Sequence, residues 1–196
     1  MPCTKFARWV LKAHTWWQRV KSGCRISAIL VISAVALPLA GLAQTVDTPA
    51  PYAYLIDLSS DTVLMDKAAH TPTAPASMSK MMTVLLLLER LKAGTISMDD
   101  TFPVSEKAWK KGGSKMFVRV GTRVPVGDLL RGIIVQSGND ACIVVAEGLA
   151  GSEEAFAAEM NARAEELGLD NSHFVNATGW PAEEHVMSAQ DLAKLA

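Results

Sequence analysis

The sequence is poor in cysteine. Three of the 196 residues are cysteines. Cys3 and Cys24 lie close to the N-terminus, so Cys142 is the sole thiol in the remainder of the chain. One cysteine cannot form an internal disulfide, so a hydrophobic core must stabilise this part of the protein.

The first acidic residue of the sequence is Asp47. The residues before it include six cations: Lys5, Arg8, Lys12, Arg19, Lys21 and Arg25. Residues 26–43 then carry no charge and end in the small residues Gly41 and Ala43. A basic start, an apolar run and small residues after it are typical of a secretory leader.

An uncharged run of this length could also remain as a membrane anchor, because about twenty apolar residues span a bilayer. Pro38 and the small residues that follow favour cleavage. We therefore expect a signal peptide at 1–43, a linker at 44–51 and a folded domain from residue 52 to the last residue. Either reading exports the domain to the periplasm or to the outer face of the cytoplasmic membrane.

Basic residues are also scarce after the leader. Residues 44–196 hold thirteen of the nineteen Lys and Arg residues but all twenty Asp and Glu residues, a formal charge of −7. This charge argues against a nucleic-acid-binding protein, which needs a basic face. His70, His173 and His185 show no ligand spacing, so we expect neither a metal site nor a cofactor.

Hydrophobic patterning predicts a helix-rich α+β chain. A hairpin is expected over residues 52–65, followed by a proline-containing loop. Residues 102–125 read as turns and short strands that bend at Gly112 and Gly113. Helices are expected at 77–92, 126–135, 139–150 and 152–167 and from Ser188 onward, with Ser152 as a cap and Gly94 as a stop.

Ser77 and Lys80 open the first of these helices, before an almost wholly apolar run. Three residues apart at a helix start, their side chains share one face. A lysine can deprotonate a serine only when it is neutral, and burial beside apolar residues lowers its pKa. The alternative is ordinary, with Ser77 as a cap and Lys80 extended to water.

A second polar turn, Ser137-Gly138-Asn139, lies between two apolar helical stretches. It could be a simple hinge in which Gly138 turns the chain and Asn139 caps the next helix. It could instead present a hydroxyl and a carboxamide at a cleft. The upstream Ser-x-x-Lys pattern favours the second interpretation. Cys142, on the following apolar helix, is expected to be a buried core thiol.

The stretches "APASMSKMMT", "PVGDLLRGIIVQSGNDACIVVAEGLAG" and "HFVNATGWPAEEHVMSAQDLAKLA" resemble the low-molecular-mass penicillin-binding proteins. More closely, they resemble serine D-alanyl-D-alanine carboxypeptidases of the peptidase S11 family, from about Tyr52 to the last residue. The resemblance implies the α+β penicillin-recognising (β-lactamase/transpeptidase-like) fold, in which a five-stranded antiparallel sheet packs against helices.

The resemblance also implies roles for particular residues. Ser77 would be the acyl-enzyme nucleophile, Lys80 its general base and Ser137 the proton relay to the leaving D-alanine. Asn139, with Gly138, would bind the substrate, a peptidoglycan stem peptide ending in D-Ala-D-Ala. β-Lactams would acylate the same serine. Membrane association would come through the leader or a C-terminal anchor.

The family's third motif, Lys-Thr/Ser-Gly on a strand, does not occur after Asn139. Lys21-Ser22-Gly23 fits the letters but lies in the leader. We therefore expect a fold that is incomplete at its C-terminus and a poor carboxypeptidase. Two alternatives remain: a class A β-lactamase, which would carry Ser-Asp-Asn at 137–139, and an inert exported fragment that binds a partner.

Overall fold

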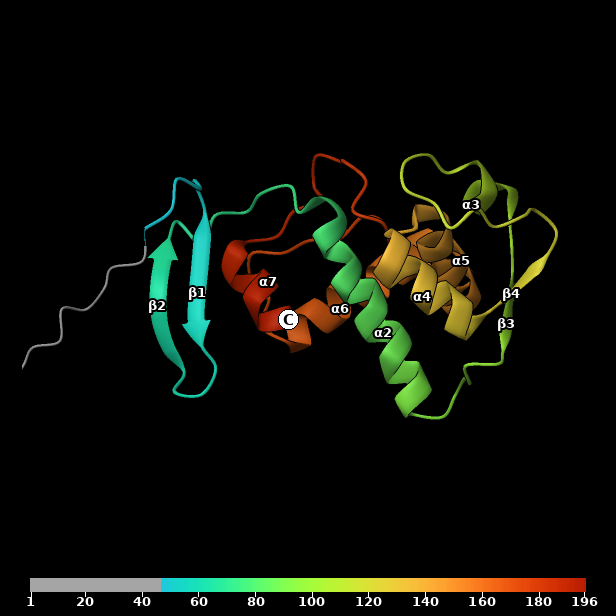
Figure 1. Cartoon of the computed structure of the whole chain (residues 1–196), viewed down its shortest axis with the longest axis horizontal. Helices are drawn as coiled ribbons and strands as arrows, with labels where there is room; N and C mark the ends of the chain where they lie inside the picture. The colour runs from blue at the N-terminus through green and yellow to red at the C-terminus, as the bar shows by residue number, and fades with distance from the viewer. Residues whose placement is uncertain (1–46) are drawn as a thin grey trace, which may run out of the picture. The chain divides into compact units, whose positions relative to one another are not determined.

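A computed structural model describes residues 47–196 (Figure 1). The predicted signal peptide and the start of the linker lie outside the described residues. Residues 47–51, the rest of that linker, form neither helix nor strand. Within 47–196, none of the helices combines the length and the apolar character that crossing a membrane requires.

An antiparallel hairpin begins the described chain, as predicted. It pairs β1 (Ala53–Asp57) with β2 (Thr62–Lys67) and contains an irregularity between Leu55 and Ile56. The Asp57 carboxylate accepts hydrogen bonds from the backbone N–H and the hydroxyl of Ser59, which stabilises the turn. A second small ladder joins β3 (Thr101–Pro103) to β4 (Arg123–Pro125).

The core forms around α5 (Asn139–Ala150), whose residues Ala141 to Ala146 are all buried. It packs against α2 (Lys80–Lys92), α4 (Val126–Gln136), α6 (Glu153–Glu166) and β3. A side chain at Gly148 would overlap the ring of Phe102, so glycine lets β3 approach this helix closely. This helix, the most apolar of those within residues 47–196, carries Asn139 as its first residue.

Serine caps fix the starts of three helices. Ser152 accepts a hydrogen bond from the N–H of Ala155 and starts α6. Ser188 starts α7 (Ala189–Leu195) in the same way, so both predicted starts are confirmed. Ser105 caps α3 (Glu106–Lys110), where we expected only turns and strands. That expectation was wrong because the cap outweighs the weak periodicity of this short segment.

Candidate functional site

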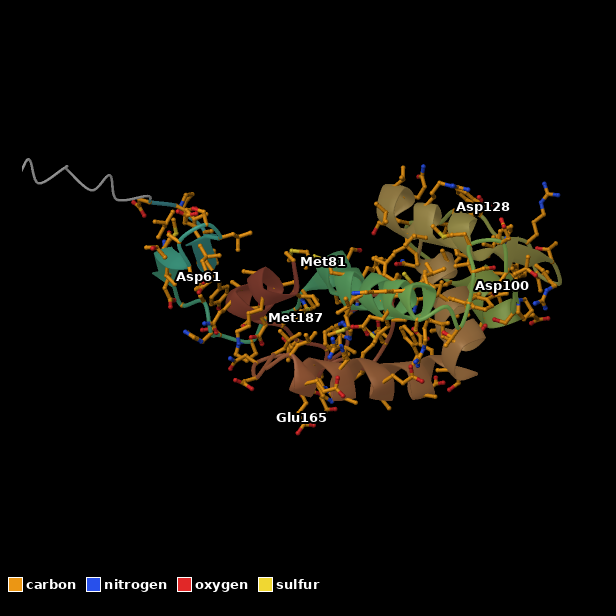
Figure 2. The ribbon with its side chains drawn as sticks, turned by 90° about the horizontal axis from the view of Figure 1, so that it is seen from below. Asp61, Met81, Asp100, Asp128, Glu165 and Met187 are labelled. Carbon is orange, nitrogen blue, oxygen red and sulfur yellow. The ribbon has the colours of Figure 1, made fainter. Side chains whose placement is uncertain are left out.

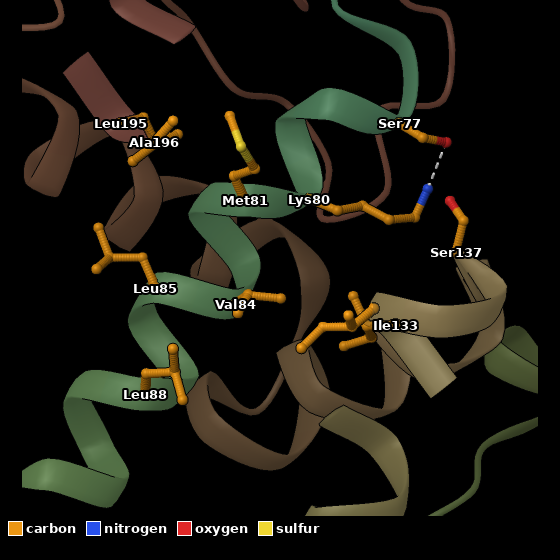
Figure 3. A pocket seen from close by; sticks show the side chains of 11 residues that line it. Ser77, Lys80, Met81, Val84, Leu85, Leu88, Ile133, Ser137, Leu195 and Ala196 are labelled. Carbon is orange, nitrogen blue, oxygen red and sulfur yellow. Dashed lines mark hydrogen bonds between the residues drawn. The ribbon is translucent and has the colours of Figure 1, made fainter. Parts of the chain in front are cut away.

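The serine and lysine of the first motif meet as predicted. Ser77 lies in a 3₁₀ turn, η1 (Ala76–Ser79), and Lys80 is the first residue of α2. The Nζ of Lys80 lies 2.8 Å from the Oγ of Ser77 (Figure 3). The side chains therefore do share a face, and the alternative in which Lys80 extends to water is wrong, since only 4% of the residue is exposed.

Burial lowers the pKa of Lys80, because the ammonium form loses its hydration. The neighbouring Cys142 is itself fully buried, as predicted, and burial raises the pKa of its thiol to about 12. Cys142 is thus a neutral thiol at neutral pH and gives the ammonium no charged partner. Met81 and Val84, which follow Lys80 on α2, line an open cleft.

A loop that is distant in the sequence contacts Lys80. The Nζ of Lys80 lies 2.7 Å from the carbonyl oxygen of Thr178. Oδ1 of Asn176 shapes this loop, because it accepts hydrogen bonds from the N–H groups of Thr178, Gly179 and Trp180 and from the Thr178 hydroxyl. Gly179 has φ +76°, and a side chain there would overlap the carbonyl oxygen of Ala76. This loop was not predicted from the sequence, although its Asn-x-x-Gly spacing is a turn signal.

Two buried side chains form hydrogen bonds with the backbone of the same loop. The Ala177 N–H donates to the carboxylate of Glu153, at 3.2 Å. The Ala177 carbonyl accepts from the hydroxyl of Thr83, at 2.8 Å. Glu153 also forms an ion pair of 3.0 Å with Lys107. Side chains of α2 and α6 therefore both fix the loop that carries the Thr178 carbonyl.

Ser137 ends α4 in the left-handed conformation, with φ +53°. This conformation is uncommon for a residue with a side chain and is found often at functional sites. The next N–H, of Gly138, donates to the carbonyl of Gly132 and closes the turn. Figure 3 shows the Ser137 hydroxyl directed toward the Nζ of Lys80. The turn thus brings a second hydroxyl to the lysine.

Asn139 does not cap α5, so that part of the hinge interpretation is wrong, although Gly138 does turn the chain. Its Nδ2 instead donates to the carbonyl of Gly112 at 2.9 Å, and its backbone N–H donates to the carbonyl of Ser114. Asp140, fully buried, accepts hydrogen bonds from the N–H groups of Met116 and Val118. Asn139 and Asp140 together attach the segment 112–118 to the start of α5.

A cleft of about 570 Å³ opens beside these groups. Figure 3 shows the polar end of the cleft at Ser77, Lys80 and Ser137, while α2 and α4 provide its apolar walls. Among residues 47–196 no three His, Cys, Asp or Glu side chains are grouped so that they could hold a metal ion. The described site presents hydroxyls, one amine and one carboxamide.

The described site combines a serine in contact with a buried lysine and a second serine on another helix. This arrangement is that of the Ser-x-x-Lys class, on an α+β framework. Comparison with known proteins identifies the family within this class.

Residues 40–196 match the family Peptidase_S11, described as D-alanyl-D-alanine carboxypeptidase. The chain is 45% identical over 144 residues to D-alanyl-D-alanine carboxypeptidase DacF of Bacillus subtilis, covering 74% of this chain and 37% of DacF. It is 41% identical over 145 residues to DacA of Escherichia coli, covering 71% and 36%. The structure is similar to that of DacD from Francisella tularensis, with a TM-score of 0.75 and 38% identity over 77% of this chain and 37% of that one.

The chain therefore belongs to the peptidase S11 family and has the penicillin-recognising fold. Both the family and the fold were predicted from the sequence. The chain spans 37% and 36% of the lengths of the first two relatives.

Proposed function

We propose that this chain provides the acylating half of a D,D-carboxypeptidase that removes the terminal D-alanine from peptidoglycan stem peptides. The observation that carries the proposal is the 2.8 Å contact between the Oγ of Ser77 and the Nζ of a lysine whose pKa burial lowers. A neutral amine in this position is a suitable base for a serine nucleophile.

Acylation begins with transfer of the Ser77 proton to Lys80. The Oγ of Ser77 then attacks the carbonyl carbon of the penultimate D-alanine and forms a tetrahedral intermediate. The C–N bond to the terminal D-alanine breaks, and its nitrogen takes a proton that passes from Lys80 through the Ser137 hydroxyl. Water later attacks the ester, which releases the shortened peptide and restores the serine hydroxyl.

Asn139 binds the substrate peptide next to this pair. The hydrogen bond from Nδ2 to Gly112 fixes its carboxamide in one orientation. In that orientation Oδ1 has no hydrogen bond within residues 47–196 and can accept one from a substrate N–H. Gly138, whose own N–H is engaged with Gly132, keeps the turn compact beside the substrate.

β-Lactams present a strained amide to the same serine and acylate it as substrate mimics. The enzyme acts outside the cytoplasm, since the stem peptide is a component of the cell wall and residues 1–43 have the pattern of a signal peptide. Membrane association occurs through this leader or through an anchor C-terminal to the domain.

The test measures D-alanine released by the full-length protein from diacetyl-Lys-D-Ala-D-Ala, together with covalent labelling by a fluorescent penicillin. We expect D-alanine release and a label that leaves slowly. Rapid loss of the label without D-alanine release would instead identify a β-lactamase. Absence of both reactions in the folded protein would contradict the proposal and indicate a binding protein.

A further inference from the structure

The charges of the chain are unevenly distributed around the site. Residues 44–196 have a formal charge of −7, yet residues 107–123 contain no acidic residue. The same segment carries six cations: Lys107, Lys110, Lys111, Lys115, Arg119 and Arg123. Lys107 and Lys110 form ion pairs, whereas Lys111 and Lys115 form none within the described residues. A local positive potential therefore remains on a negatively charged protein.

Lys111 has a defined position on an aromatic surface. Its Nζ lies 4.6 Å from the centroid of the Trp180 ring, a cation–π contact. The ring is 43% exposed and lies against Gly112 and Gly113. Lys115 donates to the carbonyl of Trp109 at 2.6 Å, which places a second ammonium near the end of α3. Lys111 is thus held on a flat aromatic surface that solvent can reach, and Lys115 lies near the end of α3.

Short connections join this surface to both polar motifs. Trp180 follows Thr178, whose carbonyl contacts Lys80, by two residues. Gly112 accepts the hydrogen bond of Asn139. A Cβ at Gly113 would lie 2.6 Å from Nδ2 of Asn139 and 3.1 Å from the Trp180 ring. Trp180 and Lys111 therefore border the region that Asn139 faces.

We propose that Lys111, supported by Trp180, is an anion-binding subsite for a carboxylate of the substrate peptide upstream of the scissile bond. This inference rests on the proposed function for its substrate but concerns a different step, recognition of charge away from the reacting bond. The indole ring of Trp180 holds the ammonium of Lys111 in position, and the ammonium binds the carboxylate.

An acidic peptide is favoured over other anions because Lys111 lies on Trp180, which borders Gly112 and Gly113 beside Asn139, the residue proposed to bind the substrate peptide. Remote contacts of this kind hold the substrate in register for reaction. A partly exposed ammonium gives a moderate effect that salt screens. We therefore expect a preference of about threefold to tenfold in binding, weakened at high ionic strength.

The test uses two peptides that differ in one charge: acetyl-Glu-(Nε-acetyl)Lys-D-Ala-D-Ala and the same peptide with Gln in place of Glu. Binding to the full-length Ser77→Ala protein is measured by calorimetry, so no turnover is needed. We expect the Glu peptide to bind more tightly than the Gln peptide. Lys111→Gln should remove the difference, while Lys111→Arg should retain it. Lys92→Gln, an exposed lysine at the end of α2, is the matched control.

Equal affinity for the two peptides, or an unchanged preference in Lys111→Gln, would overturn the subsite. The Ser77→Ala protein could prefer the Glu peptide while the protein that carries Ser77 releases no D-alanine. That result would contradict the proposed function and leave the subsite supported. Loss of affinity for both peptides to the same extent in Lys111→Gln would mean that Lys111 only supports the loop, and would also overturn the proposal.

Discussion

The carbonyl oxygen of Thr178 lies 2.7 Å from the Nζ of Lys80, although 98 residues separate the two in sequence. When Lys80 is neutral, one of its N–H groups donates to this carbonyl. The lone pair is then free to accept the hydrogen bond of the Ser77 hydroxyl, 2.8 Å away. The fixed carbonyl thus orients the amine as a base.

Replacement of the proposed nucleophile is the first test of the site. Ser77→Ala should abolish covalent labelling by penicillin, because no other hydroxyl of residues 47–196 is hydrogen-bonded to Lys80. Mass spectrometry of the labelled wild-type peptide locates the adduct. Ser59→Ala, an exposed serine in the hairpin turn, should label normally. An adduct on Ser79 or Ser137 would show that the assignment is wrong.

Lys80→Arg retains the positive charge but cannot supply a neutral base. Acylation should fall by about 10²- to 10⁴-fold, the usual contribution of a general base. In the wild-type protein, acylation should rise as pH increases through the lowered pKa of Lys80, because only the neutral amine accepts the proton. Stopped-flow acylation at a series of pH values measures both effects. Near-normal acylation by Lys80→Arg would mean that Lys80 only positions Ser77.

Asn176→Ala should destabilise the loop that carries Thr178. Four donors lose their common acceptor, and an unsatisfied buried donor costs about 1–3 kcal/mol. Asn176→Asp preserves the acceptor oxygen and should lose less stability. Chemical denaturation measures both variants, and acylation should fall more in Asn176→Ala. Equal stability of Asn176→Ala and wild type would mean that other contacts, such as Glu153 with Ala177, suffice.

Cys142 should make the folded protein less stable at alkaline pH. Its pKa is about 12 in the folded protein and 9.0 ordinarily, so between these values the unfolded chain releases a proton that the folded protein retains. Folding stability should therefore fall as pH rises above 9.0, by at most about 1.4 kcal/mol per pH unit.

Cys142→Ala lacks the thiol proton, so its folding stability should change less over the same pH range. Loss of the sulfur should lower its stability by about 1–2 kcal/mol at neutral pH. Urea denaturation of both proteins at several pH values provides the measurement. Parallel pH profiles would contradict the assignment of the thiol as the cause.

A polypeptide of the 196 residues alone should release D-alanine poorly, since no Lys-Thr-Gly sequence follows Asn139 in it. The family resemblance implies that this strand supplies an oxyanion donor, and loss of one such donor lowers the rate about 10²- to 10³-fold. Met81, Leu85 and Leu88, which line the open cleft, should also promote aggregation. Turnover equal to that of DacA, together with cooperative melting, would contradict this expectation.

The helices and the Ser77–Lys80 pair could be predicted because their signals are local. The helix at 139–150 was predicted with its observed bounds, since an apolar run begins after a glycine and ends at Gly151. The spacing of three residues placed Ser77 beside Lys80 without any tertiary information.

The loop at Thr178 could not be predicted in the same way. Its contact with Lys80 uses a backbone carbonyl, which every residue possesses, so residue type gives no signal. Glu153 is the first residue of α6, where a negative charge is ordinarily favourable, yet its carboxylate also accepts a hydrogen bond from the Ala177 N–H. Such contacts depend on how α2 and α6 pack, which the sequence pattern does not specify.

The distance along the chain between Lys80 and Thr178 determines when the site can form. Helical turns form within about a microsecond, whereas contacts between distant segments wait for the chain to close on itself. Ser77 and Lys80 can therefore become neighbours early, while Lys80 is still hydrated and charged. The buried environment that lowers its pKa is complete only after residues 176–180 have docked, so an unfolded or partly synthesised chain carries an ordinary, unreactive serine.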